Sequence, residues 1–129
     1  MKYISAEDIL VIHAQIVGET GGMHGVRDID LLTFSAYKPK TKFGGEEQFH
    51  GIFEKAAAYL DSFARHQIFS DGNKRTAIAV AARFLFINGY EFSATNKELE
   101  RFVLRVAVKE QSMSEISEWL KKNSKKIKK

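Results

Sequence analysis

The chain has 129 residues, of which 44% are hydrophobic and 28% charged, and no cysteine; this fits one compact domain and excludes disulfides, thiolate metal sites and a largely disordered chain. Its net charge of +4 comes from KKNSKKIKK at 121–129, which leaves 14 basic against 16 acidic residues elsewhere, so we expect no specific nucleic-acid partner. No apolar run approaches the roughly 18 residues of a membrane span and no signal-peptide core is found, so we expect a cytoplasmic protein with no membrane contact.

Helical periodicity dominates the first part of the chain. Ser5 followed by Asp8 predicts an N-cap with an acid in the first turn of a helix over 6–17. After a glycine-rich loop, Asp28 can cap a short second helix, which ends before Pro39.

The middle of the chain combines one exposed connection with two more helices. Residues 38–50 contain a proline, a Gly-Gly pair and few apolar residues, which predicts an exposed loop or small hairpin. From residue 51 an apolar stripe recurs at helical spacing to about residue 67. Residues 73–88 are so apolar that we expect a central helix buried on most sides.

Two further helices complete the predicted domain. Thr95 with Glu98 forms a capping box for the first, and the second lies near 114–123. We therefore predict an all-α fold with a single domain at 1–123. The basic tail at 124–129 is expected to be solvated.

The segment DGNKR at 71–75 lies where a glycine turn leads into the central helix. Unpaired backbone N–H groups and the helix dipole make such a turn suitable for binding phosphate. Lys74 and Arg75 add positive charge, and Asp71 offers a carboxylate for a divalent ion. The structural alternative is that Asp71 caps the helix and both cations are solvated.

The run FSDGNKRTA at 69–77 resembles the core motif of the Fic family, His-x-Phe-x-(Asp/Glu)-Gly-Asn-x-Arg, and the lysine after asparagine is similar to its Doc (death-on-curing) branch. Typical adenylylating members carry a second arginine where this chain has Ile78, and Doc-like members lack it. The resemblance covers nearly the whole chain and extends to GVRDIDLL at 25–32, FGGEEQF at 43–49, FEKAAAYLDSFAR at 53–65 and NGYEF after the central helix.

This resemblance implies a Fic-type helical domain and a small toxin that uses ATP to modify a translation factor. In Doc the terminal phosphate is transferred to a threonine of elongation factor Tu, which blocks protein synthesis, and a cognate antitoxin neutralises the toxin. Most Fic enzymes transfer the nucleotide moiety instead, so adenylyl transfer is an alternative. The family's built-in inhibitory string, Ser/Thr-x-x-x-Glu-(Gly/Asn), is absent from the sequence, so we expect inhibition by a separate protein.

The resemblance also assigns roles to the residues of the turn. Asp71 would hold magnesium, and Gly72 and Asn73 would shape the turn around the phosphates of ATP. Lys74 and Arg75 would neutralise charge on the transferred group, which is the electrostatic work that dominates phosphoryl transfer.

Two further assignments lie outside the turn. Phe69 would anchor its loop in the core. The connection at 38–50 resembles the family's flap, where Phe43, Gly44 and Gly45 would dock the target; a plain surface loop is the alternative.

The motif departs from the family at its catalytic histidine. Counting back from Phe69 and from Asp71, both routes reach Gln67, whereas His66 is one position too early. Helical phase predicts that Gln67 continues the apolar stripe inward and that His66 follows an outward polar stripe with Lys55. His66 could substitute as the base only if the helix ended early or bulged.

A primary amide has no useful basicity, whereas a neutral imidazole can accept a proton from threonine. Losing a general base removes roughly 10²–10⁴ in rate. We therefore predict a chain that binds nucleotide but transfers phosphate poorly, through either a disarming substitution or a natural loss of catalysis. A non-catalytic module that binds nucleotide or antitoxin is the alternative.

The remaining histidines do not indicate a metal centre. His13 lies within the first predicted helix, and His24 and His50 lie in loops with no partner at metal-ligand spacing. We expect them to be structural or solvated and propose no zinc site.

Overall fold

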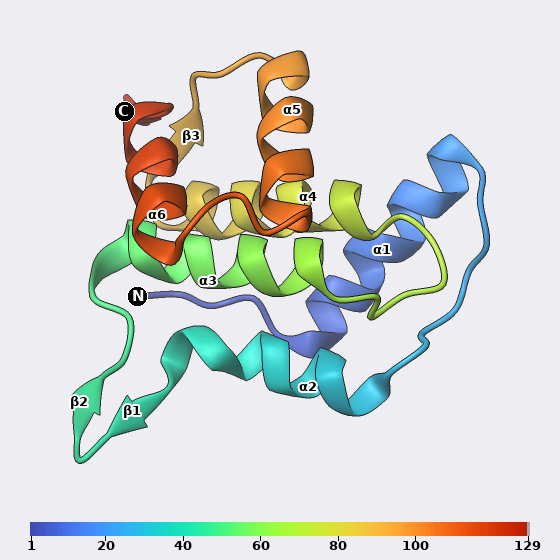
Figure 1. Cartoon of the computed structure of the whole chain (residues 1–129), viewed down its shortest axis with the longest axis horizontal. Helices are drawn as coiled ribbons and strands as arrows, with labels where there is room; N and C mark the ends of the chain where they lie inside the picture. The colour runs from blue at the N-terminus through green and yellow to red at the C-terminus, as the bar shows by residue number, and fades with distance from the viewer. Residues whose placement is uncertain (129) are drawn as a thin grey trace.

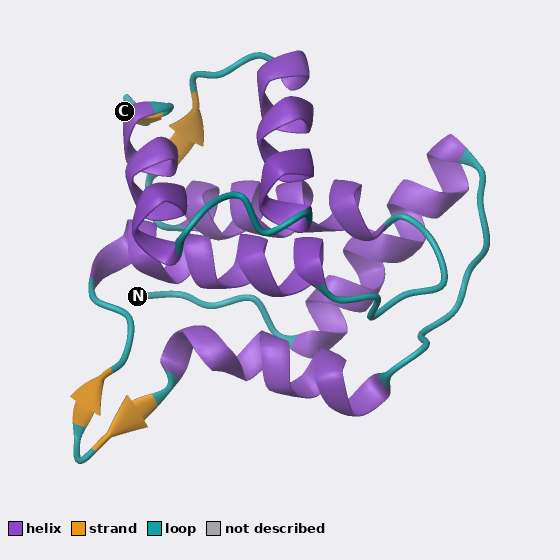
Figure 2. Ribbon diagram, in the orientation of Figure 1, coloured by secondary structure: helices purple, strands orange, loops and turns teal. Residues whose placement is uncertain are grey.

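The computed structural model describes residues 1–128, and over this range it is built from helices with two small two-stranded sheets (Figures 1 and 2). This confirms the all-α class. No helix of the described chain is long and apolar enough to cross a membrane. The six α-helices are α1 (Ala6–Thr20), α2 (Ile29–Tyr37), α3 (Gly51–Arg65), α4 (Asn73–Ile87), α5 (Asn96–Ala107) and α6 (Met113–Lys122).

The helix boundaries follow from local capping. Ser5 and Asp8 bond each other's backbone N–H groups at the start of α1, and Thr95 and Glu98 do the same for α5. Hydrogen bonding of the Glu98 carboxyl to the Thr95 backbone N–H, and then to the Thr95 side chain, lowers the pKa of that carboxyl. Helix α1 runs one turn beyond the expected residue 17 and stops at Gly21, whose positive φ of 77° no helical residue adopts.

The predicted connection between α2 and α3 is a small hairpin. A 3-10 turn (Lys38–Lys40) leads into β1 (Lys42–Phe43), which pairs antiparallel with β2 (Glu46–Glu47). Gly44 and Gly45 form its tip, both with positive φ. The hairpin comprises residues 41–48.

The second sheet includes part of the basic tail, whose Lys125 and Lys126 are exposed as expected. β3 (Tyr90–Phe92) follows α4 and pairs antiparallel with β4 (Ser124–Lys126) near the end of the chain. The Ile127 N–H also donates to the Gly89 carbonyl at 2.9 Å. The folded unit therefore extends past residue 123, because the lysine-rich end finds backbone partners on β3.

Helix α3 lies at the centre of the molecule (Figure 1). α4 packs alongside it, α5 and α6 cover another face, and the N-terminal segment and α2 lie on the remaining side. All residues from Lys55 to Ala64 are buried. The expected outward polar stripe on α3 is therefore wrong, since neighbours surround the helix and leave Lys55, Tyr59 and Ser62 at most 1% exposed. α4, by contrast, has an exposed side that carries Arg83 and Phe86.

Tyr59 shows how a polar group on α3 is accommodated. Its hydroxyl accepts the Ile4 N–H at 3.0 Å and donates to the Ile4 carbonyl at 3.3 Å. Burial of the hydroxyl raises the pKa of Tyr59 to about 12. The pair attaches the N-terminal segment to the core.

Replacing Tyr59 with Phe should destabilise the fold by about 1–3 kcal/mol at pH 8, because the buried Ile4 N–H loses its acceptor. The unfolded chain ionises Tyr59 near pH 10, whereas the folded chain does so near 12. Stability from the Tyr59 hydroxyl is thus present below pH 10 and lost as pH rises to 12, by up to about 3 kcal/mol. Urea unfolding should show that the difference in free energy of unfolding between the unaltered chain and the Tyr59→Phe variant shrinks between pH 10 and 12. Tyr37→Phe, at an exposed position, should change neither the free energy of unfolding nor its dependence on pH.

A candidate phosphate-binding site at the start of helix α4

The loop between α3 and α4 is closed by a single asparagine side chain. Asn73 Nδ2 donates to the Phe69 carbonyl at 3.0 Å, and Asn73 Oδ1 accepts the Phe69 N–H at 3.0 Å. The Phe69 ring is fully buried and stacks on His13, with ring centroids 3.8 Å apart. These contacts give the turn one fixed shape.

A segment from another part of the chain supports the same loop. Val26 and Phe69 form an antiparallel bridge, the Arg27 N–H donates to the Ile68 carbonyl at 2.8 Å, and the Ser70 N–H donates to the Gly25 carbonyl at 3.1 Å. The loop is thus held from the α1–α2 connection as well as from α4.

His13 adds a third support from α1. It is 4% exposed, and its Nε2 lies 2.7 Å from the Asp71 carbonyl oxygen. Because a carbonyl oxygen can only accept, Nε2 carries the proton. His13 therefore has the structural role expected for it.

The loop and the first turn of α4 line a cavity of about 330 Å³ that is open to solvent. Gly72 is the N-cap with φ 76°, and no side chain caps the helix among the described residues. The first N–H groups of α4 have no partner inside the helix and carry the positive end of its dipole. The cavity is lined by Gln67, Ser70, Asp71, Gly72, Asn73, Lys74 and Arg75.

This arrangement is suited to an anion. Lys74 and Arg75 are exposed in the first turn, where cations are unfavourable beside the helix dipole unless a negative ligand compensates them. Backbone N–H groups, an ammonium and a guanidinium converge on one cavity, as in phosphate sites. The alternative prediction, that the Asp71 side chain caps α4, is wrong, because the N-cap residue is Gly72 and no side chain caps the helix among the described residues.

Asp71 is oriented by backbone groups. Its Oδ1 accepts the Gly72 N–H at 3.0 Å, and its Oδ2 accepts the Met23 N–H at 3.3 Å. Gly22 makes the second contact possible, because a Cβ there would lie 2.7 Å from Asp71 Oδ2.

The donor set at Asp71 fits magnesium only in part. Among the described residues, no three His, Asp or Glu side chains gather to hold a metal. Magnesium is commonly held by one or two carboxylates together with phosphate oxygens and water. The exposed Asp71 carboxylate at the edge of the cavity would fit that pattern if a bound phosphate group supplied the further oxygens.

The structure places Gln67 differently from the helical-phase prediction, whereas His66 is exposed as that prediction expected. α3 ends at Arg65, so the phase of the helix does not extend to either residue. Gln67 is exposed and lines the cavity instead of pointing into the core, whereas His66 is exposed and does not line it. Gln67 thus lines the same cavity as Asp71, Lys74 and Arg75.

Arg27 is a site residue that sequence reasoning missed. Its Nη1 donates to Gln67 Oε1 at 2.5 Å, across 40 positions of sequence. GVRDIDLL was part of the resemblance, but nothing in its pattern distinguishes this arginine. The contact fixes the amide of Gln67 with its oxygen toward Arg27.

Similarity to known proteins identifies the family of this chain. Residues 3–85 match the model of the Fic/DOC family. The chain belongs to that family. A protein named Toxin Doc from Mycolicibacterium smegmatis is 39% identical over 93 residues, covering 72% of this chain and 69% of that protein. Protein kinase doc of Escherichia phage P1 is 31% identical over 122 residues, covering 95% of both chains. These relatives support the Doc branch.

The hairpin that resembles the Fic/DOC flap is not brought together with the phosphate cavity. It precedes the first residue of α3, whereas the cavity follows the last (Figure 1). At 1.5 Å per residue, the 15-residue helix separates the two by about 22 Å. Phe43 at the hairpin is 67% exposed, so any target that meets both parts must extend along the molecule.

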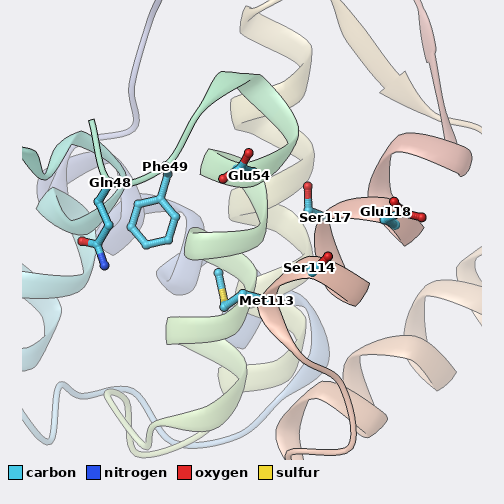
Figure 3. A pocket seen from close by; sticks show the side chains of 7 residues that line it. All are labelled: Gln48, Phe49, Glu54, Met113, Ser114, Ser117 and Glu118. Atoms are coloured by element: carbon cyan, nitrogen blue, oxygen red, sulfur yellow. The ribbon is translucent and has the colours of Figure 1, made fainter. Parts of the chain in front are cut away.

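A second cavity, of about 460 Å³, lies at the hairpin end of α3. Figure 3 shows Phe49 and Glu54 on one side of it, and Met113, Ser114 and Ser117 of α6 on another. Its charged lining residues, Glu54 and Glu118, are acidic, so it is not a second phosphate site.

Asn73→Ala should loosen the Fic/DOC loop, because both Phe69 backbone bonds are lost. We expect a loss of about 1–3 kcal/mol in the free energy of unfolding and faster hydrogen exchange at the Phe69 amide. Asn96→Ala is the matched control, since Asn96 is exposed at the start of α5. Equal effects of the two substitutions would contradict the role given to Asn73.

Proposed function

We propose that this chain is a Doc-type toxin, built to transfer the terminal phosphate of ATP to a threonine of elongation factor Tu and impaired in this form by Gln67. One observation carries the proposal: the uncapped start of α4, Lys74, Arg75 and Asp71 line a single cavity, and Gln67 lines it too. The names of the two relatives, a toxin and a protein kinase, favour the same reading.

The residues of the cavity divide the work of phosphoryl transfer. Backbone N–H groups of α4 would hold phosphate oxygens, while Lys74 and Arg75 would stabilise the charge that spreads over the transferred group. Magnesium held at Asp71 would neutralise further phosphate charge. Because Asn73 and His13 fix the loop before ligand arrives, little reorganisation is needed.

A neighbouring hollow supports a nucleotide over a simple phosphate. Arg75 lines both the phosphate cavity and a more apolar hollow of about 370 Å³, whose lining includes Ile16, Ile78 and Leu99. A nucleoside attached to phosphate has this combination of an apolar body and a charged end. Ile78 stands where adenylylating members of the family carry arginine, which favours phosphate transfer over adenylyl transfer.

The catalytic deficit follows from the chemistry of residue 67. A base at this position would take the proton from the threonine hydroxyl as its oxygen attacks phosphorus. The Gln67 amide cannot accept that proton at neutral pH, and its oxygen already accepts a hydrogen bond from Arg27. His66 is outside the cavity lining, so it does not replace the base from its present position.

A toxin of this kind requires an antitoxin and a cytoplasmic target. A separate inhibitory protein would be needed because the chain has no inhibitory string of its own. We propose that it acts on the translation machinery of the cytoplasm.

Gln67→His should raise labelling of elongation factor Tu by roughly 10²–10⁴ through restored base catalysis. The assay compares ATP labelled at the γ-phosphate with ATP labelled at the α-phosphate, so that phosphate and adenylyl transfer give different signals. Gln67→Asn is the matched control and should remain inactive.

Two results would contradict the assignment of the base. One is labelling by the unaltered chain that His66→Ala abolishes, which would make His66 the base. The other is an inactive Gln67→His variant that still binds ATP, which would favour a non-catalytic nucleotide-binding module.

A further inference from the structure

The hairpin is attached to the core by one buried side chain. Lys55 lies in the second turn of α3 and is 1% exposed. Its Nζ donates to the Pro39 carbonyl at 3.2 Å and to the Phe49 carbonyl at 2.9 Å, and it lies 3.3 Å from Glu47 Oε2. The first two acceptors are on the chain just before and just after the hairpin, and the third is in strand β2.

We infer that Lys55 is a positioning residue, whose ammonium fixes both ends of the hairpin and thereby sets the direction in which the hairpin presents a protein target. The target-docking part of this inference rests on the function proposed above. The attachment of the hairpin to α3 does not depend on that function.

The buried charge of Lys55 is paired and bonded. Of the three donors of its ammonium, two reach backbone carbonyls, and the Glu47 carboxylate forms an ion pair with it. The Tyr3 ring also lies near the cation, with Nζ 5.8 Å from the ring centroid. Burying a charge is costly unless it is paired and bonded in this way, so a lysine here needs the hairpin in place.

The hairpin has little structure of its own to fix its direction. Each of its strands has two residues, and all four strand residues are exposed. Isolated two-stranded hairpins are marginally stable. Its orientation must therefore be set at its base, where Glu47 reaches the buried Lys55 while its own side chain is 43% exposed.

The distance to the phosphate cavity makes this orientation important. The base of the hairpin and the cavity lie at opposite ends of α3, about 22 Å apart along its axis. A target held by the hairpin must place one hydroxyl beside Gln67, so a change in the angle of the hairpin relative to α3 displaces the reacting group. Loosening the attachment of the hairpin should therefore weaken productive binding of the target without changing ATP binding.

The first test uses the unaltered chain and its variants without any target. Glu47→Gln removes the charge that pairs with Lys55 and leaves both carbonyl bonds in place. Hydrogen exchange at residues 42–48, including the Gln48 amide that donates to the Thr41 carbonyl at 2.9 Å, should become about fivefold faster, which matches the loss of a partly buried ion pair. Glu46→Gln is the matched control on the same strand and should leave the rates unchanged. Equal rates in the two variants would overturn the inference.

The second test adds Glu47→Gln or Glu46→Gln to the active Gln67→His background. Glu47→Gln should raise KM for elongation factor Tu about tenfold, with kcat and the KM for ATP unchanged, because a positioning residue does not act on the reacting atoms. Faster hairpin exchange with an unchanged target KM would overturn the positioning role while leaving phosphate transfer intact. If Gln67→His labels nothing, the proposed function fails, and the exchange rates alone decide whether Lys55 holds the hairpin.

Discussion

Burial of the middle of α3, from Lys55 to Ala64, is the constraint on which the rest of the structure depends. A helix surrounded on all sides has no solvent to satisfy its polar side chains, so each must find a partner within the protein. Tyr59 bonds the N-terminal segment, Lys55 bonds the base of the hairpin, and Arg65 bonds the Val106 and Gln111 carbonyls near the end of α5. The same helix that forms the core therefore organises three peripheral segments.

At the candidate phosphate cavity, by contrast, polar and charged groups at the start of α4 are left without side-chain partners within the described chain. The loop before α4 is tightly bonded by Asn73 and by the α1–α2 connection, yet the first turn of α4 has no side-chain cap and carries two cations. An ordinary helix would avoid this arrangement through an acidic or hydroxyl cap. The two cations are thus held in an electrostatically unfavourable position by a rigid loop. Such a local conflict is typical of a site that binds a charged ligand.

Sequence reasoning succeeded where structure is set by neighbouring residues. The Thr95–Glu98 capping box, the end of α2 before Pro39 and the Gly-Gly hairpin all depend on contacts within a few positions. It failed where partners are distant. The lysine-rich strand β4 is ordered by β3, more than 30 positions away, and the burial of Lys55 depends on carbonyls outside its own helix.

The site shows the same division. Counting along the motif predicted that Gln67 takes the catalytic position, and the structure places it at the cavity. Helical phase gave the wrong orientation because it assumed that α3 continues past Arg65. Arg27 could not be found at all, since its contact with Gln67 arises only when the α1–α2 connection folds against the motif loop.

The bond between Asp71 and Met23 links two properties of the molecule that would otherwise be separate. Asp71, which lines the candidate phosphate cavity, also accepts the Met23 N–H of the glycine-rich connection through Oδ2, and a Cβ at Gly22 would lie only 2.7 Å from that oxygen. A cation drawing on that oxygen would weaken its hold on Met23. If a cation binds at Asp71, its occupancy and the order of the α1–α2 connection are coupled equilibria: ordering of the connection changes cation affinity by the same factor as cation binding changes that order.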